Sequence, residues 1–497
     1  MGVPINGSAR IGTPLWWFLS YRSQKSEYID EYVEGSGLIA RELILRDAVY
    51  EGEHDDGWVS SWILPGLFPS LGDTLHCFDY GELSSALIRR SEADVRRLLS
   101  QSRDHVLERG HHRHTPLHLS VCWPLGLRIL FELANDTCVS IIDATDSAGL
   151  TPLKYAINWS QFESVAILLE HNSAINLEDI SSYAPRFVKR TKPEDKKICD
   201  LLAATLVARR TDMLQYALKH LPESEVAGFD LRKMSFLKEN AYEVGQSLKS
   251  KTACLPASFK DVGPGSIYHQ PFMGDLLAEA LFEVGFESVD LRWNDCTPLM
   301  IQRWHHLGYA VRGINWFCQK QADLLAVMTG TLLLSSADPP PGPLQFRVVH
   351  RVASILGYGT AKERLDEDYW SEHLSEYLCL TSKILSNACR DPCRCYCAPD
   401  GCNPASLFAK SWIEMKVQKA STGFDNDLDS MKIAFDMMVL EVMCGAQEDV
   451  QAAFIRVFTF HELNMRHTCC EHHGDEYEFS RKWDIFSTYP ENGRCGN

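Results

Sequence analysis

The sequence lacks the features that mark several large classes of protein. None of its apolar runs reaches the 18 residues of a bilayer-spanning helix. Positive charge is in deficit, because 49 Lys and Arg stand against 66 Asp and Glu and leave a net charge of −17. That balance disfavours binding to duplex nucleic acid or to an anionic membrane. The P-loop, GxSxG, HExxH and dinucleotide-binding motifs are absent as well, so we expect no enzymatic activity.

The beginning of the sequence also lacks a basic segment followed by an apolar core, the pattern of a signal peptide. Its 17 cysteines among 497 residues are too few for a disulfide-built scaffold. We therefore expect an intracellular protein, cytoplasmic or nuclear, with reduced thiols. The length suggests about three domains.

A tetrapeptide recurs in the first two thirds of the chain. TPLH at 115–118 is followed 36 residues later by TPLK at 151–154, and TPLM stands at 297–300. Small and apolar residues also recur at fixed distances after the first two copies, as in the pairs Ser120 and Ala156, Ile129 and Val165, and Leu133 and Leu169. A fixed period of this length is typical of a repeat protein.

These residues resemble the ankyrin repeat, which consists of a turn and two antiparallel helices and carries a TPLH signature. In that pattern the Thr caps the first helix and the Pro fits its first turn. A single helix pair is too small to bury its own apolar face, so neighbouring pairs must stack. The resemblance implies an all-α fold that binds other proteins through its concave surface.

The repeats are expected to form an interrupted solenoid over residues 79–335. Clean repeats lie at about 111–178 and further repeats at about 266–330, while degenerate pairs lie at about 79–110 and 196–222. Residues 1–78 are expected to form an N-terminal helical cap, and the proline-rich stretch 337–343 a linker.

Turns and first helices of such repeats supply the contacts to a protein partner. The expected contact residues are Arg113, His114, Trp123, Asp146, Trp159, Asn294 and Trp304. The tryptophans have a second interpretation as packing between repeats. The run HHRHTPLH at 111–118 allows a surface metal site or a pH switch, but the resemblance implies that His118 bonds turn backbone and that the other histidines lie in an exposed turn.

Residues 345–497 are expected to form a helical, cysteine-rich C-terminal domain. Five cysteines fall between 389 and 402, and the run HTCCEHH follows at 467–473. Zinc prefers four Cys or His ligands from two chain segments. We therefore expect a structural zinc ion held by four of Cys393, Cys395, Cys397, Cys402, His467, Cys469, Cys470 and His472. Buried free thiols, or disulfides in a secreted protein, are the alternatives.

The whole layout resembles a group of fungal ankyrin-repeat proteins with a C-terminal cysteine-rich module. The resemblance depends on the IYHxP-like segment at 267–271, the DxCxCxC…GCxP pattern at 391–404 and the HTCC at 467–470. We expect a protein–protein interaction scaffold or adaptor. The alternatives are a metal-dependent enzymatic or ligase-recruiting activity of the Cys/His module, and a purely structural part in a larger assembly.

Overall fold

The computed structural model describes residues 80–110, 113–176, 193–252, 265–270, 273–293, 296–302, 307–329, 345–362, 367–387, 401–421 and 448–463, with residues 256, 259, 389 and 390. This part of the chain is predominantly helical, as predicted, and includes one two-stranded ribbon. None of its helices is both long and apolar enough to cross a bilayer. It divides into two compact units, one made by residues up to 263 with 280–285, the other by 264–279 and 286 onward.

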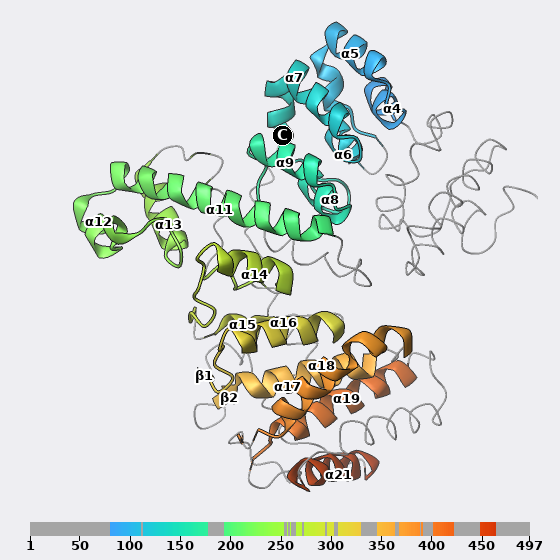
Figure 1. Cartoon of the computed structure of the whole chain (residues 1–497), viewed down its shortest axis with the longest axis vertical. Coiled ribbons are helices and arrows are strands. Elements are labelled where there is room, and N and C mark those ends of the chain that lie inside the picture. Colours follow the sequence, from blue (N-terminus) through green and yellow to red (C-terminus); the bar gives the residue numbers. More distant parts are fainter. Residues whose placement is uncertain are drawn as a thin grey trace, which may run out of the picture. The chain divides into compact units, whose positions relative to one another are not determined.

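The first unit begins with three helix pairs that stack in register (Figure 1). The shorter first helices α4, α6 and α8 contact one another in that order, and the second helices α5, α7 and α9 form a parallel row. Their bounds are Glu82–Ile88 (α4), Glu92–Gln101 (α5), Pro116–Ser120 (α6), Pro124–Ser140 (α7), Pro152–Asn158 (α8) and Phe162–Glu170 (α9), with a 3-10 turn η3 at Arg103–Leu107. Each pair therefore buries an apolar face that it cannot cover alone.

The predicted caps are present at the first helices of this stack. Thr115 accepts a hydrogen bond from the His118 amide and Thr151 one from the Lys154 amide, and a proline follows each threonine at the first helical position. Helix α4 has no such threonine. Instead, the Glu108 carboxylate accepts hydrogen bonds from the Leu83 and Ser84 amides. A carboxylate suits this end because the helix dipole is positive there.

The links between first and second helices also repeat. Arg90 after α4 and Ser160 after α8 both have positive φ, 55° and 52°. Each is followed by a residue whose amide bonds a carbonyl in the last turn of the helix, which gives the same left-handed helix end in both pairs. The repeat seen in the sequence is thus accompanied by a repeated backbone conformation at the ends of α4 and α8.

The degenerate helix pair predicted at 196–222 is wrong. A single helix, α11, spans Pro193–His220. After Pro193 the segment contains neither Gly nor Pro to end a first helix, and acidic residues in its first turn and Lys219 and His220 in its last turn complement its dipole.

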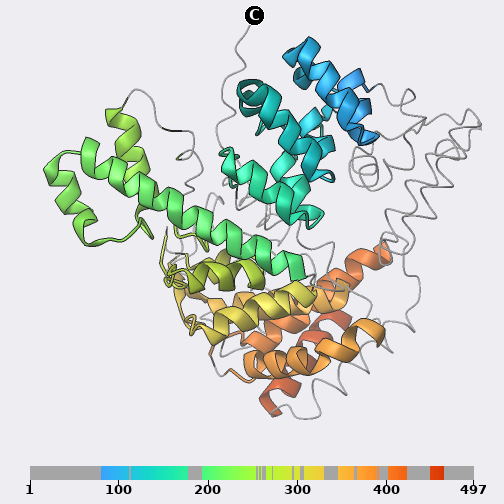
Figure 2. The same ribbon diagram turned by 45° about the horizontal axis from the view of Figure 1, so that its top comes forward.

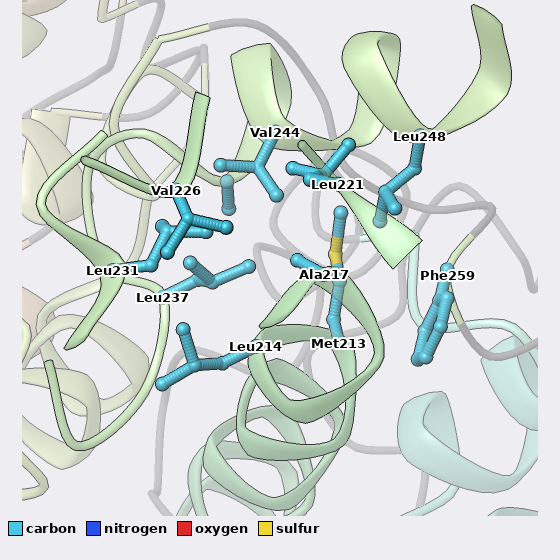
Figure 3. Packing of buried hydrophobic residues seen from close by; sticks show 11 residues of the cluster. Met213, Leu214, Ala217, Leu221, Val226, Leu231, Leu237, Val244, Leu248 and Phe259 are labelled. Carbon is cyan, nitrogen blue, oxygen red and sulfur yellow. The ribbon is translucent and has the colours of Figure 1, made fainter. Parts of the chain in front are cut away.

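The end of α11 belongs to a second apolar core, shown in Figure 3. Helices α12 (Glu223–Gly228) and α13 (Ala241–Lys251) and the 3-10 turn η6 (Leu231–Lys233) fold back onto it. Met213, Leu214 and Ala217 of α11 are buried there with the members of the other elements, Val226, Leu231, Leu237, Val244 and Leu248.

The second unit joins the last helix pair to the C-terminal helices (Figure 2). Helices α14 (Asp275–Glu283, whose end belongs to the first unit), α15 (Pro298–Ile301) and α16 (Leu307–Gln319) precede strands β1 (Val327–Thr329) and β2 (Gln345–Arg347). The strands pair antiparallel, with Val327 opposite Arg347. Helices α17 (Val348–Lys362), α18 (Glu367–Leu385), α19 (Pro404–Ser421) and α21 (Glu448–Glu462) follow.

The predicted boundary between a solenoid ending at 335 and a separate domain from 345 does not separate compact units. Helix α17 packs against α15 and α16, and the Val348 and Val349 amides bond the carbonyls of Ala326 and Leu324. The backbone pairing of β1 with β2 brings α17 directly onto the preceding helices. The linker predicted at 337–343 and the cap predicted at 1–78 lie outside the described residues.

Helix α17 is the centre of the second unit and crosses α19 at very short distance. Gly357 permits this approach, since a Cβ at that position would lie 2.2 Å from the Phe408 carbonyl oxygen. The Ser354 and Ser411 hydroxyls form a hydrogen bond across the same contact at 2.8 Å. The two helices can therefore pack this closely only with a residue that has no side chain at position 357.

Candidate partner-binding site

The turns that precede the first helices contain buried polar side chains that bond the backbone. In the turn at 146–150, the Asp146 amide bonds the Leu150 carbonyl, and Gly149 has a φ of 78°. The Asp146 carboxylate lies inside the turn and accepts hydrogen bonds from the Ala148 and Leu150 amides at 2.9 and 2.8 Å. Its other oxygen accepts one from the Tyr155 hydroxyl at 2.8 Å. Asp146 thus fixes the turn to the helix that follows it.

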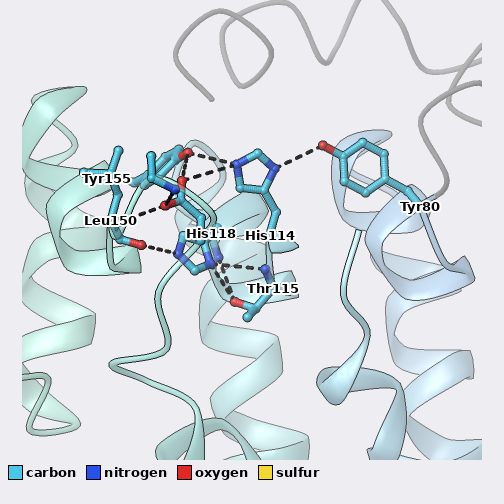
Figure 4. Close-up of polar contacts among 8 residues, drawn as sticks. Tyr80, His114, Thr115, His118, Leu150 and Tyr155 are labelled. Atoms are coloured by element: carbon cyan, nitrogen blue, oxygen red, sulfur yellow. Dashed lines mark hydrogen bonds and ion pairs between the residues drawn. The ribbon is translucent and has the colours of Figure 1, made fainter. Parts of the chain in front are cut away.

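His114 continues this network across the three helix pairs (Figure 4). Its Nε2 lies 2.9 Å from the Tyr155 hydroxyl, and its Nδ1 lies 3.3 Å from the hydroxyl of Tyr80, just before α4. Because Tyr155 donates to Asp146, Nε2 of His114 donates to the Tyr155 hydroxyl, and in a neutral ring Nδ1 then accepts from Tyr80. Burial raises the pKa of Tyr80 well above its usual value, so its hydroxyl stays protonated as a donor.

His118 joins its own helix to the next turn. Its Nδ1 accepts hydrogen bonds from the Thr115 amide and hydroxyl at 3.1 and 2.8 Å, and its Nε2 donates to the Leu150 carbonyl at 2.9 Å. Leu150 immediately precedes the cap Thr151. The bond to turn backbone expected for His118 is therefore confirmed.

The second unit contains the same arrangement with a different sequence. The amide and hydroxyl of Ser266 donate to Nδ1 of His269 at 3.0 and 2.9 Å, and Nε2 of His269 donates to the Cys296 carbonyl at 3.1 Å. Cys296 immediately precedes Thr297, just as Leu150 precedes Thr151. The segment SIYH at 266–269 therefore has the hydrogen bonds of TPLH, which its sequence alone does not reveal beyond the shared final histidine.

A hydrogen bond between the segments that follow successive second helices also repeats. The Asp143 carboxylate after α7 accepts from the Ala174 amide after α9. The Asp290 carboxylate after α14 accepts from the Asp323 amide after α16. The residues before these amides continue the match, since Asn172 and Gln321 have φ of 63° and 62°. Both ends of the helix pairs thus repeat in the two units.

The buried histidines make stability sensitive to acid. Burial lowers the pKa of His118 from 6.5 to about 4, and burial also lowers the pKa of His269. The unfolded chain therefore binds a proton at His118 between pH 6.5 and 4 while the folded chain does not. Stability is fully present above pH 6.5 and falls as the pH drops toward 4, by roughly 3 kcal/mol at most from His118.

This prediction is checked with urea unfolding midpoints at pH 7 and pH 4.5. Carboxylates also titrate in that range, so the comparison is with a His118→Asn variant, whose amide still accepts at the same place without titrating. We expect a smaller pH dependence in the variant. Equal pH dependence in the two proteins would show that His118 does not titrate with unfolding.

The predicted contact residues fall into two groups. Arg113 is exposed at the tip of the turn 110–114, and Trp123 and Trp159 are half-buried at the ends of α6 and α8. The Trp123 ring lies on the first turn of α7, because a Cβ at Gly126 would be 2.1 Å from its Cε3. The Trp123 side chain thus packs within its own helix pair and keeps part of its surface exposed, while its contact with a partner stays a prediction. Asn294 and Trp304 lie outside the described residues.

His114 and Asp146 are not surface groups, and the expectation that His114 lies in an exposed turn is wrong. Both side chains are buried, at 0% and 2% exposure, because the turns fold over them and use their polar atoms. Direct contact with a partner is thus not available to these side chains. They fix the turns in which Arg113 and Gly149 are exposed.

Sequence reasoning missed an apolar residue beside Trp123. Leu125, in the first turn of α7, is 46% exposed. The place of Leu125 in the repeat does not predict its exposure. Whether a leucine there is exposed or buried depends on how the neighbouring helix pair packs. Trp123 and Leu125 together form an apolar edge at the junction of α6 and α7.

The zinc prediction falls almost entirely on residues that are not described. Of the eight candidate ligands, Cys402 alone is described; it is buried just before α19, and its carbonyl accepts a hydrogen bond from Nε2 of His350 at 3.1 Å. Among the described residues, no group of three or more His, Cys, Asp or Glu is placed to hold a metal ion. The zinc site stays a prediction.

Comparison with known proteins adds no assignment. No protein-family model matches the chain, and no curated protein sequence is significantly similar to it. The resemblance to ankyrin repeats thus remains a prediction from the sequence.

Proposed function

We propose that the protein is a scaffold or adaptor that binds another protein through an ankyrin-like array of helix pairs. The observation that carries the proposal is the repeated turn, in which His118 and His269 bond the carbonyls of Leu150 and Cys296, each placed just before the next cap. Such turns hold successive pairs in one orientation. A row of first helices held in this way presents a continuous surface.

The apolar edge at the end of α6 is the best candidate for the contact itself. Trp123 and Leu125 are partly exposed at the junction of α6 and α7, and Trp159 is partly exposed at the equivalent end of α8. Large apolar side chains at the centre of an interface supply most of its binding energy. The proposed partner surface therefore contains Trp123, Leu125 and Trp159.

A Leu125→Glu variant is expected to lose partner capture and keep its fold. The acidic side chain would lie in the first turn of α7, where it complements the helix dipole, so stability should be unchanged within about 0.5 kcal/mol. A charge inside a desolvated apolar contact opposes binding, and we expect at least a tenfold loss of captured partner. The measurement is quantitative affinity capture beside a thermal melt followed by circular dichroism.

Val139→Glu is the matched control. Val139 is 43% exposed in the last turn of the same helix, distant in sequence from the apolar edge. Its capture should equal that of the unchanged protein. Equal losses in both variants would mean that the edge has no special part in binding.

A further inference from the structure

The turn at 110–114, before α6, has an arginine at the position where the equivalent turn at 146–150 has a glycine. In both turns the first amide bonds the last carbonyl, Gly110 to His114 and Asp146 to Leu150. The fourth position is Gly149 in one turn and Arg113 in the other, with φ of 78° and 63°. A side chain in this left-handed conformation is strained relative to glycine, and such strain is often found at functional positions.

A second arginine, Arg109, lies at the base of the same turn. The Arg113 amide bonds the Gly110 carbonyl at 2.9 Å, which brings the backbone of Arg113 next to the residue that follows Arg109. Partial burial, and then the charge of Arg113, lower the pKa of Arg109. Both residues are exposed. Neither has an ion pair in the described part of the chain.

The nearest carboxylate in the sequence is already in use. Glu108 accepts hydrogen bonds from the amides at the start of α4 and from the Ser84 hydroxyl at 3.0 Å, and it also contacts the His105 ring at 3.2 Å. The turn itself is held by the buried bonds of His114 to Tyr80 and Tyr155. Among the described residues, no carboxylate forms an ion pair with either guanidinium group, and both arginines are exposed.

We propose that Arg109 and Arg113 bind the carboxylates of an acidic peptide segment of a protein partner. Guanidinium groups bind carboxylates in a planar, two-bond geometry. Leu107, two residues before Arg109 in the chain, is 46% exposed, and an exposed apolar residue so near in sequence favours a peptide over a small anion. The proposal rests on the proposed binding function and names the chemistry of its partner.

The test is fluorescence anisotropy of a labelled ten-residue peptide of alternating Glu and Leu, titrated with the full chain. Because the chain carries a net charge of −17, it has no general attraction for such a peptide. A peptide with Lys in place of Glu and inorganic phosphate as a competitor are the comparisons. We expect binding of the Glu peptide alone, weakened as salt rises from about 50 to 300 mM.

Arg113→Gly is the decisive variant, since it removes the charge and installs the residue that the equivalent turn uses. We expect about fivefold weaker binding, and about twentyfold with Arg109→Gln added. The control is Arg128→Gln, an exposed arginine of α7, which should bind normally. Unchanged binding in the double variant, equal loss in the control, or displacement by millimolar phosphate with no selectivity for the Glu peptide would overturn the proposal.

The peptide-binding test can fail independently of the partner-capture test of the proposed function. Leu125→Glu should leave binding of this peptide intact while it removes partner capture. If capture depends on Leu125 but the peptide does not depend on the arginines, the scaffold proposal stands and the acidic-peptide proposal falls. If the peptide depends on the arginines and capture does not depend on Leu125, the arginines bind the acidic segment and the apolar edge takes no part in capture.

Discussion

Asp146→Ala is expected to destabilise the first unit by about 4 kcal/mol and to lower its melting temperature by roughly 10 °C. The carboxylate is 2% exposed and accepts three hydrogen bonds, from two turn amides and the Tyr155 hydroxyl. Alanine leaves these donors buried without an acceptor, and each unmade bond costs about 1–3 kcal/mol. The measurement is thermal or urea unfolding of the full chain followed by circular dichroism.

Two further variants test whether the lost stability comes from the buried hydrogen bonds of Asp146. Asp146→Asn retains an acceptor oxygen inside the turn and should lose about half as much stability. Asp143→Ala removes a carboxylate that also accepts a backbone amide, from Ala174, but that is exposed to water, and it should cost about 1 kcal/mol. If Asp146→Ala is no worse than Asp143→Ala, the buried network does not hold the stack together.

Gly357→Ala is expected to destabilise the second unit by about 3 kcal/mol. The added Cβ would lie 2.2 Å from the Phe408 carbonyl oxygen, so helices α17 and α19 must move apart and lose packing along their contact. The better helix propensity of alanine offsets only about 1 kcal/mol. Hydrogen exchange of the α17 and α19 amides measures the effect in this unit alone.

Gly359→Ala is the matched control on the same helix. Its Cβ would lie 3.0 Å from Cδ1 and 3.3 Å from Cβ of Leu307, and 3.5 Å from the Leu307 Cα, so the tight contacts are with a side chain, which yields at smaller cost than backbone. We expect a change within about 1 kcal/mol. Similar exchange rates in the two variants would argue against the close crossing of α17 and α19.

The local signals in the sequence predicted the helix pairs well because they act over a few residues. Thr115 and Thr151 cap helices, and Pro116 starts one, through contacts with neighbours in the chain. The same reasoning failed at 196–222, where similar apolar spacing occurs in one long helix. Spacing alone does not show where a helix ends, and the segment lacks the Gly or Pro that would have ended it.

The candidate site was predicted less well, because burial depends on residues distant in the sequence. Arg113, His114 and Asp146 look alike as polar turn residues, yet only Arg113 is exposed. Tyr80 and Tyr155, 75 positions apart, together enclose the His114 ring, and nothing local to His114 reveals either partner. The match of SIYH at 266–269 to TPLH was likewise visible only once the Cys296 carbonyl was seen opposite His269.

Quantitative affinity capture tests whether the stacked helix pairs bind a protein partner. The full chain is compared with a Trp123→Ala/Trp159→Ala variant, and circular dichroism of both proteins is recorded. We expect a partner bound in stoichiometric amount by the unchanged chain, at least tenfold less on the variant, and native helicity in both. Equal capture by the two proteins, or a loss of helicity in the variant that accounts for the lost capture, would contradict this expectation.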